Sequence, residues 1–61
     1  MAGKTFWFRD PFAGDESAPG NSIEDAIEGA YAHIAPEERP AYVTYRGRQI
    51  AVPGGTCVPL Q

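Results

Sequence analysis

The chain has 61 residues and a formal net charge of −3, with 43% hydrophobic and 21% charged residues. This length predicts one small domain, 1–61, with little stability to spare for a strained active site. The single cysteine excludes an internal disulfide, and no apolar run approaches the roughly 20 residues of a membrane span. No signal-peptide apolar region follows the first four residues. We therefore expect a cytoplasmic protein.

Charge is segregated along the chain. All eight acidic residues fall between Asp10 and Glu38, and this stretch contains no lysine or arginine. Such segregation bears on the choice of partner more than on the fold. The five basic residues all lie outside the stretch: Lys4, Arg9, Arg39, Arg46 and Arg48.

The aromatic segment 4–9 predicts a first strand, with Phe6 and Phe8 on one face and Trp7 on the other. Pro11 ends this strand because proline has no backbone N–H to donate. The segment 10–21 is rich in Gly, Pro, Asp and Ser, which predicts an acidic loop.

A helix is predicted over about 23–35. Ser22 is a good N-cap, and Asp25 three residues later completes a capping box. Pro36 should end the helix near residue 35, because the residue before a proline leaves the helical region. One apolar stripe follows the helical period: Ile23, Ala26, Ile27, Ala30, Tyr31 and Ile34.

The segment 41–52 predicts a hairpin with a two-residue turn at Arg46 and Gly47. This register places Val43 and Ile50 on the core face, and a tail follows over 53–61. The element order β-α-β-β predicts an α+β fold, in which one helix packs on one face of a three-stranded antiparallel sheet. We expect the last strand in the centre, since every strand pairing is then antiparallel.

The sequence favours a non-enzymatic protein without cofactor or metal. It has one histidine and one cysteine, which is too few for a paired metal-ligand spacing. Cys57 and His33 are the one candidate nucleophile–base pair, and Cys57 lies in a terminal tail where catalytic geometry is hard to hold. The basic turn Arg46–Arg48 is interpreted as solvent-exposed rather than phosphate-binding, so we expect no direct contact with nucleic acid.

The acidic stretch is the main functional signal. Glu28 lies four residues after Glu24, and such a like-charge pair costs a helix about 0.2–0.5 kcal/mol. One interpretation is an ordinary solvated helix face. The other is a negative surface that meets a basic surface on a protein partner. The predicted partner-binding carboxylates are Asp15, Glu16, Glu24, Asp25, Glu28, Glu37 and Glu38.

The outer face of the sheet is the second signal. Trp7 and Tyr42 should lie there, opposite the helix, and both residue types are common interface anchors. Three alternatives stay open: a partner covers them, the tail covers them through Val58 and Leu60, or two copies of the chain pair there. We therefore leave the choice between monomer and homodimer open.

As a tiny acidic β-α-β-β domain, the chain resembles phage-encoded anti-CRISPR proteins that inhibit type I surveillance complexes. The resemblance rests on the opening strand 4–8, the acidic helix start 22–28 and the hairpin turn at Arg46 and Gly47. It implies an inhibitor that occupies a DNA-binding or PAM-reading surface, with carboxylates in place of phosphates. It also implies a location in the cytoplasm of the infected bacterial host.

The segment 20–27 also resembles the strand-to-helix entry of HicB-like antitoxins. Those proteins have more strands before the helix than the single one predicted here. This second resemblance implies a toxin-neutralising or oligomerising protein.

Overall fold

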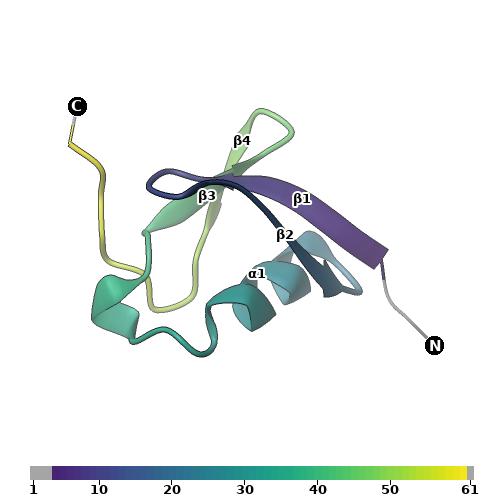
Figure 1. Ribbon diagram of the computed structural model, residues 1–61, viewed down its shortest axis with the longest axis horizontal. Coiled ribbons are helices and arrows are strands. Elements are labelled where there is room, and N and C mark those ends of the chain that lie inside the picture. Colours follow the sequence, from purple (N-terminus) through teal and green to yellow (C-terminus); the bar gives the residue numbers. More distant parts are fainter. Residues whose placement is uncertain (1–3, 61) are drawn as a thin grey trace.

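The computed structural model describes residues 4–60 and shows a small α+β domain of order β-β-α-β-β. One antiparallel sheet has the strand order β2-β1-β3-β4, and the helix α1 lies on one side of it (Figure 1). The elements are β1 (Lys4–Asp10), β2 (Gly14–Gly20), α1 (Ile23–Tyr31), the 3-10 helix η1 (Pro36–Glu38), β3 (Tyr42–Tyr45) and β4 (Arg48–Ala51).

The strand β2 corrects the predicted loop over 10–21. It pairs with β1 along its whole length, from Asp10 opposite Gly14 to Lys4 opposite Gly20. The backbone groups along one edge of β1 need hydrogen-bond partners, and β2 supplies them despite its loop-like composition. As an edge strand, β2 also tolerates Pro19. The sheet therefore has four strands instead of three.

The predicted strand order is also wrong, because β1 and β3 occupy the centre and β4 forms an edge. The strand β2 reverses the chain before the helix, which lets β3 pair antiparallel with β1. The predicted hairpin register is confirmed, with Val43 opposite Ile50. Arg46 and Gly47 both have positive φ, at 52° and 78°, as a tight two-residue hairpin turn requires.

The predicted start of the helix is confirmed and its predicted end is wrong. The Asp25 amide donates to Ser22 Oγ at 3.2 Å, and Asp25 Oδ2 accepts from the Asn21 amide at 3.1 Å. The helix ends at Tyr31, and the chain continues in turns up to η1, which begins at Pro36. Gly29 weakens the last helical turn, and that turn has no basic side chain to favour the helix dipole.

The core lies between α1 and the inner face of the sheet. Ile27 and Val43 are fully buried, and Ile34 still packs against the core from its turn beyond the helix. Burial of Phe8 and exposure of Trp7 confirm the predicted faces of the first strand. The full buried apolar set is Phe8, Ala18, Ala26, Ile27, Tyr31, Val43 and Val52.

The tail is held beside the start of β3. Pro40 and Cys57 form a parallel bridge, and the Ala41 amide donates to the Cys57 carbonyl at 2.8 Å. A Cβ on Gly55 would lie 1.9 Å from the Pro40 carbonyl oxygen, so only glycine permits this approach. Leu60 is 99% exposed and Trp7 is 68% exposed, so the alternative in which the tail covers the outer sheet face is wrong.

Among residues 4–60 no helix qualifies as a membrane span, since the α-helix has only nine residues.

Candidate functional site

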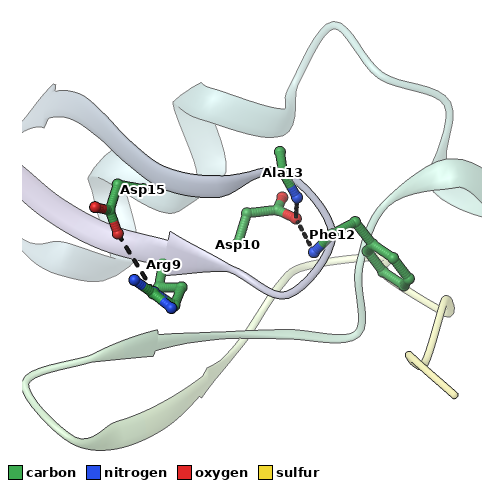
Figure 2. A network of polar contacts seen from close by, with 5 residues as sticks. All are labelled: Arg9, Asp10, Phe12, Ala13 and Asp15. Atoms are coloured by element: carbon green, nitrogen blue, oxygen red, sulfur yellow. Dashed lines mark hydrogen bonds and ion pairs between the residues drawn. The ribbon is translucent and has the colours of Figure 1, made fainter. Parts of the chain in front are cut away.

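Asp10 has a structural role inside the fold. Its Oδ1 accepts the Phe12 amide at 2.7 Å and the Ala13 amide at 2.9 Å, which closes the turn between β1 and β2 (Figure 2). Its Oδ2 accepts the Tyr31 hydroxyl at 2.5 Å. One buried carboxylate thus joins the first hairpin to the end of α1, and it is not available to a partner.

The hydrogen bonds around Asp10 and Tyr31 shift the pKa values of both side chains. Burial by itself raises the pKa of Asp10, but the Tyr31 hydroxyl and the two turn amides outweigh burial and hold the pKa below its usual value. Burial, followed by the hydrogen bond to Asp10 and its negative charge, raises the pKa of Tyr31 well above its usual range. Both effects keep the hydroxyl protonated and the carboxylate charged at neutral pH.

Asp15 and Glu16 of β2 point to opposite faces of the sheet. Asp15 lies on the outer face of the sheet, where its Oδ1 is 3.3 Å from Arg9 Nε (Figure 2). Glu16 points to the opposite face, is half-buried, and lines a hollow with His33 and Ala30. Asp15 is therefore separated from the acids of α1 and η1, whereas Glu16 shares the helix side of the sheet with them but is half-buried beside Ala30 and His33.

The remaining five acids also lie on the helix side of the molecule, and all five are exposed. Glu24, Asp25 and Glu28 are exposed on α1, and Glu37 and Glu38 are exposed on η1, which lies on the same side of the sheet (Figure 1). We call these five residues the helix-side acids.

The protein's own bases do not neutralise the helix-side acids. Within residues 4–60 the ion pair of Arg9 with Asp15 stands alone. Arg39 directly follows Glu38, yet its guanidinium donates to the carbonyls of Ile34, at 2.7 Å, and Pro53, at 3.0 Å. The helix-side acids are therefore exposed carboxylates without an internal counter-charge in this part of the chain.

The outer sheet face carries Trp7 and Tyr42 as predicted, but on the opposite side from the helix-side acids. Trp7 stands between two surface hollows, of about 550 and 370 Å³, and Arg46 lines both. Lys4 lines the larger one, and the Arg46 guanidinium lies 5.6 Å from the centre of the Tyr45 ring. The predicted binding residues thus divide into an acidic helix side and an aromatic, partly basic sheet side.

An apolar groove lies where the β1–β2 turn, the end of α1, η1 and the tail meet. Its volume is about 590 Å³. Phe12 and Val58, which are 57% and 63% exposed, belong to its lining, as do the carboxylate-bearing Glu37 and Glu38. The other lining residues are Asp10, Ala13, Tyr31, Ile34, Pro40 and Cys57.

Sequence reasoning missed this groove. Its signals are two large apolar residues, Phe12 and Val58, that fall outside every periodic pattern of the chain. Nothing in their spacing brings residues 12, 34 and 58 together, because only the tertiary fold does so.

The candidate nucleophile Cys57 is engaged elsewhere. Its Sγ donates to the Glu37 carbonyl at 3.1 Å, and the residue lines the apolar groove. His33 lines a different hollow, beside Glu16. Over residues 4–60 no three His, Cys, Asp or Glu side chains converge in a way that would hold a metal ion.

Comparison with protein-family models, with curated proteins and with solved structures found no match to this chain. The surfaces described above are therefore the guide to its function.

Proposed function

We propose that the protein is a non-catalytic binding domain that docks its helix-side acids against a basic surface of a macromolecular partner. The observation that carries the proposal is the exposure of these carboxylates without an ion pair inside residues 4–60. Glu24 and Glu28 also repel each other across one helical turn, at a cost of about 0.2–0.5 kcal/mol that folding does not require. A basic partner that binds these carboxylates would offset this repulsion.

The finer form of the proposal is an inhibitor that competes with nucleic acid. Carboxylates on a compact scaffold match a groove that normally holds phosphates, and complementary charge speeds the encounter and sets its specificity. The resemblance to anti-CRISPR proteins makes a type I surveillance complex the first partner to test. In that setting the domain would occupy a DNA-binding or PAM-reading surface.

Competition for target DNA tests this proposal. We expect the wild-type protein to displace labelled double-stranded target DNA from a purified type I complex. The paired change Glu24→Gln and Glu28→Gln should weaken displacement about tenfold, which corresponds to about 1.4 kcal/mol of lost binding free energy. Asp15→Asn removes an acid from the opposite face, and as the control it should leave displacement unchanged. Undiminished displacement by a folded double variant would contradict the proposal.

A HicB-like antitoxin or another oligomerising protein is the second candidate. The hairpin of β1 and β2 favours it, because it puts two strands before the helix where the sequence predicted one. The exposed Trp7 offers a surface on which two copies would pair. This candidate requires a dimer through the sheet, and Trp7→Ala should dissociate it. A molar mass of one chain at every concentration in light scattering would contradict it.

A further inference from the structure

We propose that the apolar groove receives one large apolar side chain from a basic segment of a partner protein, while Glu37 and Glu38 bind the cations that flank it. This inference rests on the proposed function, since it assumes a partner with a basic surface. It adds the kind of segment that this basic surface presents to the groove. That segment has one large apolar side chain between lysines or arginines.

The first wall of the groove is held in place before any partner binds. Phe12 is the residue whose amide donates to Asp10 Oδ1 at 2.7 Å, and the Ala13 amide donates to the same oxygen at 2.9 Å (Figure 2). The Tyr31 hydroxyl fixes the other oxygen of that carboxylate. A turn ordered in this way keeps Phe12 exposed at small entropic cost, and such preorganisation strengthens binding.

The tail holds a second part of the groove lining. The Cys57 amide donates to the Arg39 carbonyl at 3.0 Å, and the Cys57 thiol donates to the Glu37 carbonyl at 3.1 Å. These bonds fix the backbone directly before Val58, whose side chain is 63% exposed. Both parts of the lining are therefore anchored and present apolar side chains to solvent.

The charges that line the groove select the occupant. Glu37 and Glu38 line it, and no lysine or arginine among residues 4–60 does so. Arg39, the nearest base in the sequence, has its guanidinium bonded to the Ile34 and Pro53 carbonyls. An acidic or neutral segment would leave these carboxylates uncompensated, whereas a basic segment matches them.

The groove is larger than one side chain, so it has room for a large apolar anchor together with parts of the residues that flank it. Its volume of about 590 Å³ lies within the range of about 300–1,000 Å³ that is usual for ligand sites. Large side chains in such pockets, tryptophan above all, supply much of the binding energy of protein interfaces. An aromatic or long aliphatic side chain in the groove would contact the exposed apolar lining to which Phe12 and Val58 belong.

Titration of the isotope-labelled protein with three synthetic peptides, followed by amide chemical shifts, tests this inference. The probes are Arg-Lys-Trp-Lys-Arg, the same peptide with alanine at its centre, and Glu-Glu-Trp-Glu-Glu. We expect the first to shift the amides of Ala13, Ile34 and Val58 and to bind at least tenfold more tightly than the other two. The variants Phe12→Ala and Val58→Ser should each remove most of this tenfold preference.

The variant Glu24→Gln with Glu28→Gln separates this inference from the proposed function. It weakens the general attraction of basic peptides to α1, but it should leave the preference for the central tryptophan intact. Equal affinity for the tryptophan and alanine peptides, with shifts confined to α1, would overturn the groove and leave the acidic recognition surface standing. Groove shifts that depend on protein concentration without peptide would also overturn it, because a second copy would then be the occupant.

Discussion

Asp10 belongs to the acidic stretch of the sequence, but its role is to stabilise the fold. Its carboxylate accepts two turn amides and the Tyr31 hydroxyl, so it joins residues that are 21 positions apart. The same network aims Phe12 into solvent at the edge of the groove. A buried hydrogen bond to a charged group contributes about 1.5–3 kcal/mol, a large part of the stability of a domain this small.

Tyr31→Phe tests this network. It leaves a buried carboxylate oxygen of Asp10 without its hydroxyl donor, and we expect the free energy of unfolding at neutral pH to fall by about 1.5–3 kcal/mol in urea titration. Because the network lowers the pKa of Asp10, its stabilisation is present above the unfolded value of 3.8 and disappears as the pH falls through the lower folded pKa.

The difference between wild type and Tyr31→Phe should therefore shrink below about pH 4. Tyr42→Phe is the matched control, since within residues 4–60 the Tyr42 hydroxyl makes no hydrogen bond to the protein. A stability difference that stays constant down to the acid transition would contradict this, because the Tyr31 hydroxyl would then stabilise the fold without the charged Asp10 carboxylate.

Among the helices and strands, the sequence predicts the features that a local residue pattern determines. The stripe from Ile23 to Ile34 predicts the helix and its buried face, and the Arg46–Gly47 turn fixes the hairpin register. The strand β2 escapes prediction because its residues have little strand preference, and its pairing with β1 comes from tertiary context.

The end of the helix escapes prediction for a related reason. The apolar period continues to Ile34, but the chain leaves the helix after Tyr31 and still packs Ile34 on the core from a turn. The candidate site likewise has one part that the local sequence pattern predicts and one part that only the tertiary fold forms. The exposure of the acids on α1 follows from the helical period, whereas the groove of Phe12 and Val58 depends on contacts between distant segments.

At the scale of the whole molecule, charge is distributed unequally between two sides. The helix-side acids lie opposite a sheet face where Arg46 lines both hollows beside Trp7 and Lys4 lines the larger one. A basic partner therefore meets an attractive field only from the helix side, which orients the encounter. The attraction should weaken with salt, because screening at about 0.15 M reduces the interaction of exposed charges over about 8 Å.

Capture of partners from a bacterial cell lysate tests whether the helix-side acids are the surface that a partner recognises. Immobilised wild-type protein is compared with Glu24→Gln/Glu28→Gln and with Lys4→Ala/Arg46→Ala, and the bound proteins are quantified by mass spectrometry. We predict a partner that the wild type and the Lys4→Ala/Arg46→Ala variant both enrich and that the acid variant loses. A partner that the acid variant retains and the Lys4→Ala/Arg46→Ala variant loses would show that recognition runs through the sheet face instead.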